Sequence, residues 1–139
     1  MGNNLSINKI NFEDMKYIQN KSNSIIINTI ESYKQDCLID GTLSVTEEEN
    51  TLNNLLDKGQ IEEQIIIYGE NSTDNTIINK YIQLKKLGFV NVYIYMGGLF
   101  EWLLLQDIYG KDYFKTTTIE KDFLKYKGTQ KLNVKLICN

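Results

Sequence analysis

The polar loop from Gly69 to Asp74 is the part of this chain best placed to do chemistry. It reads Gly69-Glu70-Asn71-Ser72-Thr73-Asp74, and it follows an apolar run over residues 64–68 that predicts a strand. A helical pattern over residues 75–87 comes next. A loop that joins a strand to a helix N-terminus presents unpaired backbone N–H groups, which bind anions in many α/β proteins. The 69–74 loop is therefore the candidate functional site.

The hydroxyl residues of this loop, Ser72 and Thr73, lack the partner that a nucleophile needs. The chain contains no His, so no imidazole can act as the general base. We interpret both side chains as hydrogen-bonding groups of the loop or as the N-cap of the helix that follows. Asp74 or Asn75 could serve as that N-cap equally well.

Composition excludes several other functions. Besides His, the chain lacks Arg, Pro and Ala, and its 15 basic and 18 acidic residues leave a net charge of −3. Without Arg there is no bidentate capture of phosphate or sulfate. The lysines are dispersed rather than gathered in a basic stripe, so no binding to nucleic acid is expected. We also predict no cofactor and no metal ion, because the usual zinc ligands are missing except for two cysteines.

The two cysteines, Cys37 and Cys138, are far apart in sequence and indicate no disulfide framework. Free thiols are typical of the reducing cytoplasm, which is the predicted location. A free cysteine is more often structural than reactive, yet Cys37 stays open as an alternative nucleophile. The acidic runs at residues 47–49 and 62–63 are interpreted as solvated helix faces.

The N-terminus matches the pattern for N-myristoylation, with Gly2 as the acceptor and Ser6 as the small hydroxyl residue. We treat residues 1–6 as a lipidation leader. One myristoyl chain binds a membrane with a partition constant of only about 10⁴ M⁻¹. No cysteine lies near Gly2 to carry a second lipid. The prediction is reversible contact with the cytoplasmic face of a membrane, or docking of the lipid into a partner.

Apolar and polar periodicities alternate between strand and helix along the chain. Strands are predicted over residues 7–10, 25–27, 43–45, 64–68 and 91–95. Helices are predicted over residues 12–19, 46–58, 75–87 and 99–108. Thr46 and Glu49 have the spacing of a capping box. This alternation predicts one α/β domain with a mostly parallel sheet.

Two stretches near the end of this pattern resemble the closing signature of the rhodanese, or sulfurtransferase, family. They are Leu87-Gly88-Phe89-Val90-Asn91-Val92-Tyr93 and Gly97-Gly98-Leu99-Phe100-Glu101-Trp102. The segment 38–45 is similar to a second family segment from which His and Pro are lost. The resemblance implies a rhodanese-like three-layer domain over residues 7–115, with a central, mostly parallel five-stranded sheet flanked by helices. Residues 116–139 would then form a C-terminal extension.

The same resemblance implies a site whose chemistry has been lost. In the family a cysteine opens this loop and carries sulfur as a persulfide, but here that position is Gly69. Glu70 and Asp74 stand where the family often has Arg, and Ile30 stands where it commonly has another Arg. Two carboxylates would repel an anionic sulfur donor. We expect the loop pocket to suit a cationic group of a partner, such as a lysine.

Three functions remain open at this level. The first is a catalytically inactive rhodanese-like domain that acts as an interaction or scaffold module for protein partners. The alternative is an active sulfurtransferase that uses another cysteine, such as Cys37. The third is a structural subunit whose tail, Lys131 to Ile137, adds a strand to a neighbour. Trp102 is expected to be a core anchor in each case.

Overall fold

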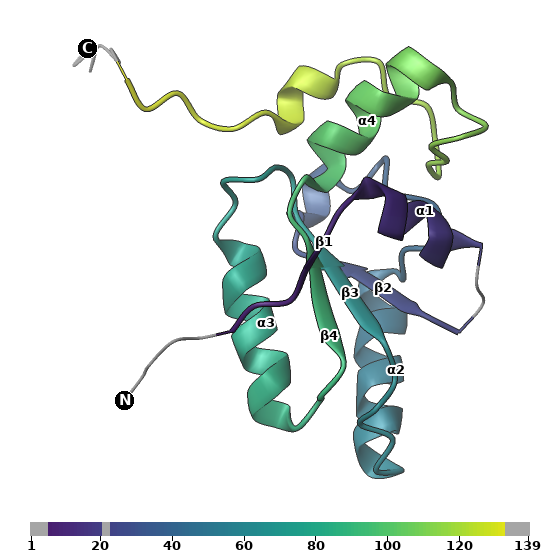
Figure 1. The fold of residues 1–139 in the computed structure, drawn as a ribbon, viewed down its shortest axis with the longest axis vertical. Helices are drawn as coiled ribbons and strands as arrows, with labels where there is room; N and C mark the ends of the chain where they lie inside the picture. The colour runs from purple at the N-terminus through teal and green to yellow at the C-terminus, as the bar shows by residue number, and fades with distance from the viewer. Residues whose placement is uncertain (1–5, 21–22, 133–139) are drawn as a thin grey trace.

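The protein was examined as a computed structural model that describes residues 6–20 and 23–132. A single parallel sheet forms its centre (Figure 1). Its strands are β1 (Lys9–Ile10), β2 (Ile25–Asn28), β3 (Ile65–Tyr68) and β4 (Val92–Tyr95). They lie in the order β1-β4-β3-β2, so β4 and β3 are the central strands and each has a neighbour on both sides. The register aligns Ile65 of β3 with Ile25 of β2 and with Val92 of β4.

Helices cover both faces of this sheet. They are α1 (Phe12–Gln19), α2 (Val45–Asp57), α3 (Thr76–Leu87) and α4 (Gly98–Tyr109), with short 3₁₀ turns η1 (Ser32–Lys34) and η2 (Phe123–Tyr126). Helices α1 and α4 pack on one face and α2 and α3 on the other. The predicted three-layer α/β fold is thus confirmed.

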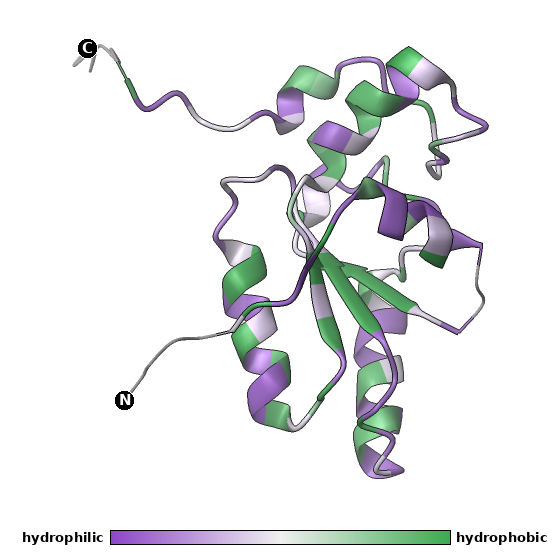
Figure 2. Ribbon diagram, viewed as in Figure 1, coloured by the Kyte–Doolittle hydropathy of each residue, from purple (hydrophilic) through white to green (hydrophobic). Residues whose placement is uncertain are grey.

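Strand β3 shows why a run of isoleucines was needed. All four of its residues are buried, and the side chains alternate between two cores. Ile66 and Tyr68 join the core under α1 and α4, whereas Ile65 and Ile67 join the core under α2 and α3. A parallel sheet that is covered on both faces requires such continuously apolar strands. Figure 2 shows this as hydrophobic colour along most of β3.

The prediction of five strands was wrong by one within the described residues. Residues 43–45 do not form a strand, and only Thr42 makes a single bridge to Ile26 of β2. Ser44 is instead the N-cap of α2. Its hydroxyl oxygen accepts the Glu47 N–H, and the Glu47 carboxylate accepts the Ser44 N–H, so the helix begins at Val45. The sequence offers two overlapping capping boxes here, and the expected Thr46–Glu49 box was the wrong one.

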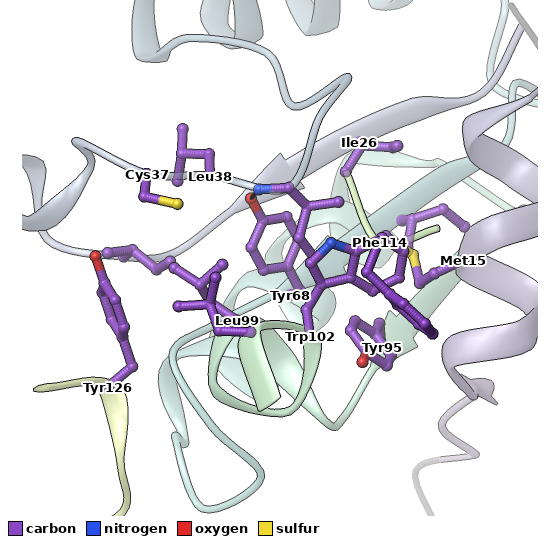
Figure 3. Packing of buried hydrophobic residues seen from close by; sticks show 14 of the residues in the cluster. Met15, Ile26, Cys37, Leu38, Tyr68, Tyr95, Leu99, Trp102, Phe114 and Tyr126 are labelled. Atoms are coloured by element: carbon purple, nitrogen blue, oxygen red, sulfur yellow. Dashed lines mark hydrogen bonds between the residues drawn. The ribbon is translucent and has the colours of Figure 1, made fainter. Parts of the chain in front are cut away.

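Trp102 is a core anchor, as expected. Its side chain is fully buried on α4, edge-on to Tyr95 at 6.2 Å and to Phe114 at 5.1 Å between ring centroids. The indole N–H donates to the carbonyl of Lys115 at 3.0 Å, which satisfies its one polar group. These rings pack together with Met15 of α1 (Figure 3). The indole therefore joins α4, the sheet and the chain that follows α4.

The chain after α4 wraps back over the domain, and we call residues 116–132 the C-terminal strap. The Thr117 N–H donates to the carbonyl of Leu38, the Leu38 N–H donates to the Thr117 hydroxyl, and the Thr118 hydroxyl donates to the carbonyl of Asp36. Farther on, Tyr126 is fully buried, and its hydroxyl donates to the carbonyl of Lys34. The described part of the predicted extension thus packs against the domain and reaches its core.

Tyr68, the last residue of β3, holds the segment before α2 in place. Its buried hydroxyl accepts the Ile39 N–H at 3.1 Å and lies 2.7 Å from Thr42 Oγ1. Because the Thr42 hydroxyl donates to the Ile39 carbonyl at 2.6 Å, Tyr68 must be the donor to Thr42. Burial, which outweighs these hydrogen bonds, raises the pKa of Tyr68, so the hydroxyl stays protonated.

We expect Tyr68→Phe to lower the free energy of unfolding by about 1–3 kcal/mol, because a buried backbone N–H and a hydroxyl lose their partner. Urea unfolding measures this change. The matched control is Tyr93→Phe on β4, whose hydroxyl has no hydrogen bond to any described residue. That variant should change stability by less than about 0.5 kcal/mol. Equal costs for the two variants would contradict this account of Tyr68.

Candidate functional site

The 69–74 loop lies at the carboxyl end of β3, where the start of α4 meets it. The carbonyl oxygen of Gly69 accepts the Leu99 N–H at 2.9 Å, and that of Glu70 accepts the Phe100 N–H at 2.8 Å. These N–H groups belong to the first turn of α4, where no carbonyl of the helix itself can pair with them. The loop thus caps α4, and α4 fixes the position of the loop.

The Gly97-Gly98 turn makes this contact possible. Gly98 has φ +71, and a Cβ there would lie 2.7 Å from the Gly69 oxygen and 2.9 Å from the Asn71 nitrogen. A Cβ at Gly97 would collide with the carboxylate of Glu101, which accepts a hydrogen bond from Tyr95. Gly98 is therefore required by a positive φ and a close approach to rigid backbone, whereas a side chain at Gly97 would require the Glu101 side chain to move.

Asp74 fills the space that a side chain at position 69 would occupy. Its Oδ2 lies 2.6 Å from the position of a Cβ built on Gly69, and the same oxygen accepts the Glu70 N–H at 3.2 Å. The other oxygen accepts the N–H and the hydroxyl of Thr76, at 3.0 and 2.6 Å. An internal carboxylate thus takes up the loop's N–H donor and caps the first turn of α3. Of the N-cap candidates from the sequence, Asn75 occupies the N-cap position but its side chain makes no capping bond, and Asp74 is the one that binds a helix N–H.

Glu70 is also satisfied within the chain. Its carboxylate forms an ion pair with Lys34 of η1 at 3.1 Å, and both side chains are largely shielded from solvent. Sequence analysis did not identify Lys34, because it is 36 residues away and no local pattern links it to the loop. The resemblance implies an Arg at position 70. This chain has Glu70 there, and Lys34 of η1 neutralises its carboxylate.

The remaining loop residues have structural roles. The Asn71 amide donates to the carbonyl of Tyr126 on the C-terminal strap at 2.9 Å, and its oxygen accepts the N–H and hydroxyl of Thr73. Ser72 is exposed, and its hydroxyl makes no hydrogen bond to another described residue. Ile30, at the third position where the family has Arg, is 4% exposed and belongs to the core. Neither hydroxyl of the loop is held beside a base.

A polar pocket of about 330 Å³ opens above the loop. Its lining combines loop residues with residues of η1, α3 and the C-terminal strap: Thr29, Glu31, Lys34, Glu70, Asn71, Thr73, Asp74, Thr76, Lys125, Lys127, Thr129 and Lys131. Of its two loop carboxylates, Glu70 is paired with Lys34, and Asp74 is hydrogen-bonded to N–H groups and keeps its charge. That the pocket suits a cationic group stays a prediction. Four lysines line the pocket, and three of them come from the strap.

Cys37 does not lie in this pocket. Its side chain is fully buried, and the thiol donates to the carbonyl of Thr118 on the strap at 3.3 Å. Figure 3 places it near Leu38 and Tyr126, on the inner side of the segment before α2. A sulfur-transferring thiol has to be reached by its donor. Gly2 and Cys138 lie outside the described residues.

No helix among the described residues is long and apolar enough to cross a membrane.

Comparisons with known proteins agree with this architecture. The sequence profile of the rhodanese-like domain matches residues 13–105. A solution NMR structure of the rhodanese-like domain from an Anabaena sp protein has a TM-score of 0.55 at 18% identity, covering 94% of this chain and 93% of that chain. A crystal structure of an Anabaena sp protein also has a TM-score of 0.55 at 18% identity, covering 84% and 97%. At these identities the likeness concerns the fold. No curated protein matches the chain in sequence.

With its profile matched over two thirds of its length and its three-layer fold shared, the chain belongs to the rhodanese-like domain family.

Proposed function

We propose that this protein is a catalytically inactive rhodanese-like domain that works as an interaction or scaffold module for protein partners. The observation that carries the proposal is the filled space beside Gly69. The position that holds the family's cysteine has no side chain, and the carboxylate of Asp74 lies 2.6 Å from where its Cβ would be. Gly69 offers no nucleophilic side chain, and the Asp74 carboxylate occupies the space where one would lie.

The surroundings of the loop support this proposal. Persulfide chemistry needs an ionised, accessible thiol in an electropositive environment. At the loop, the Asp74 carboxylate accepts the Glu70 N–H and keeps its negative charge, and Lys34 neutralises Glu70, so no unpaired cation of the loop is left to stabilise a thiolate. The alternative, a sulfurtransferase that uses Cys37, is disfavoured because that thiol is fully buried and bonded to Thr118.

A thiosulfate-to-cyanide sulfur-transfer assay tests the proposal. We expect no turnover above the uncatalysed rate for the natural protein, and the same result for Cys37→Ser. Turnover by the natural protein would overturn the proposal. If that turnover disappeared in Cys37→Ser, the alternative function would replace it. A Cys138→Ser variant, which changes the other thiol, serves as the control.

The second part of the proposal is reversible membrane association of a cytoplasmic protein through myristoyl-Gly2. It is supported by the Gly2…Ser6 motif at the N-terminus. When the protein is co-produced with an N-myristoyltransferase, we expect labelled myristate to be incorporated and partial sedimentation with liposomes. Gly2→Ala should abolish both, and Asn3→Ala should leave both unchanged. Equal sedimentation of the natural protein and Gly2→Ala would contradict this part alone.

A further inference from the structure

The end of the C-terminal strap, Lys127–Lys131, is fixed directly over the loop. The residue before it, Tyr126, gives its carbonyl to the Asn71 amide. Lys127 then has an extended backbone, with φ −65 and ψ 159. At Gly128 a Cβ would lie only 2.9 Å from Thr73 Oγ1, so the strap passes close to the loop. This segment lies outside residues 13–105, which match the family.

Alternate residues of the segment face the pocket. Lys127, Thr129 and Lys131 line it, which is the period of two that an extended chain produces. The backbone N–H and C=O groups of Thr129 and Gln130 make no hydrogen bond to other described residues. The segment therefore resembles an open strand edge, which can pair with another extended chain.

The strap side of the pocket is positively charged. Lys125 pairs with Glu120, but Lys127 and Lys131 have no carboxylate partner among the described residues. In the rest of the lining, Lys34 neutralises Glu70, whereas Asp74 accepts hydrogen bonds only from N–H and hydroxyl groups and keeps its negative charge. Glu31, which also lines the pocket, has no ion-pair partner in the described ranges. The strap thus gives the pocket a basic side.

We propose that Lys127–Lys131 is a docking edge for an acidic, extended segment of a protein partner. Lysines are flexible point charges and lack the fixed fork with which Arg grips a small oxyanion. Two of them spaced along an extended chain fit negative charges that are spaced along another extended chain. Such complementarity steers encounter and fixes register more than it adds affinity. This inference rests on the proposed function as an interaction module and names the chemistry of the partner.

The test is fluorescence anisotropy with a labelled peptide of alternating Glu and Thr, and with its Lys–Thr counterpart. We expect the acidic peptide to bind at about 50 mM NaCl and to weaken at about 300 mM, because exposed charges are screened. The basic peptide should not bind. Changing Lys127→Gln and Lys131→Gln together should weaken binding roughly five- to tenfold. Glu31→Gln should strengthen it by roughly twofold.

The matched control carries Lys58→Gln and Lys86→Gln, which remove the same charge at the ends of α2 and α3, remote from the loop in Figure 1. It should leave binding unchanged within a factor of two. An equal loss in this control would mean nonspecific attraction and would overturn the proposal. Failure of the acidic peptide to bind at low salt would do the same. So would inorganic phosphate that displaces the peptide at equal concentration, since that indicates a small-anion site.

These outcomes are separable from those of the proposed function. Sulfur transfer in the thiosulfate assay would overturn the inactive-domain proposal without affecting peptide binding. Peptide binding that depends on Lys127 and Lys131 would stand in either case. Because both lysines are exposed, the variants should keep the fold, and circular dichroism with urea unfolding checks this.

Discussion

Gly69→Cys, which introduces the residue that the resemblance implies at this position, is expected to destabilise the protein by about 3 kcal/mol and to yield no sulfur transfer. The new Cβ would lie 2.6 Å from Asp74 Oδ2 and 2.9 Å from Ile77 Cγ2. Forcing atoms into a filled space costs about 1–3 kcal/mol. The carboxylate can move away only by giving up its bond to the Glu70 N–H. Urea unfolding and the thiosulfate assay measure the two effects.

A double-mutant cycle with Asp74→Ala tests the cause. Asp74→Ala alone should cost about 1–2 kcal/mol, because the Thr76 N–H of α3 loses its cap. When the two changes are combined, the loss of unfolding free energy should be at least about 1 kcal/mol smaller than the sum of the single losses, because substitutions at contacting residues are not additive. The introduced thiol should then react with iodoacetamide faster than buried Cys37 does. Pairing Gly69→Cys with the remote Asp57→Ala should be additive. Additivity with Asp74→Ala as well would show that the carboxylate does not block position 69.

Gly98→Ala is expected to have the largest effect on stability, about 3–5 kcal/mol. A residue with a Cβ is strained at φ +71 by roughly 1–2 kcal/mol. The Cβ would also lie 2.7 Å from the Gly69 oxygen, and this atom belongs to rigid backbone rather than to a movable side chain. Relief would require α4 to separate from the loop, which would break the bonds to the Leu99 and Phe100 N–H groups. Such a loss is comparable to much of the stability of a typical domain.

Gly59 provides the matched control for this prediction. It has a similar φ of +67, but a Cβ there would have no neighbour within 4 Å. Gly59→Ala should therefore cost only the backbone strain, about 1 kcal/mol. The difference between the two variants isolates the contact between the Gly-Gly turn and the loop. If both variants were equally stable in urea, the close approach at Gly98 would not be a constraint of the fold.

The order of strands and helices could be predicted from the sequence because it depends on local patterns. The isoleucine run of β3 and the capping residue Asn11 of α1 signal their elements without long-range contacts. Gly88 ends α3 with φ +113, as the position of a glycine after a helical pattern indicates. The predicted strand over residues 43–45 failed where two local signals competed. Ser44 won as the N-cap, and the residues after it entered α2.

The absence of a side chain at position 69, on which the proposed inactivity depends, could also be read from the sequence, since it is a property of a single residue within a recognisable pattern. The side chains that surround position 69 could not be predicted from the sequence. Asp74 occupies the empty space, Lys34 neutralises Glu70, and Lys127 reaches the pocket from the strap. Sequence periodicity reports which face of an element is apolar, not which distant charges meet. Those charges are brought together by the packing of η1 and the strap against the loop, so only the tertiary structure decided the electrostatics of the site.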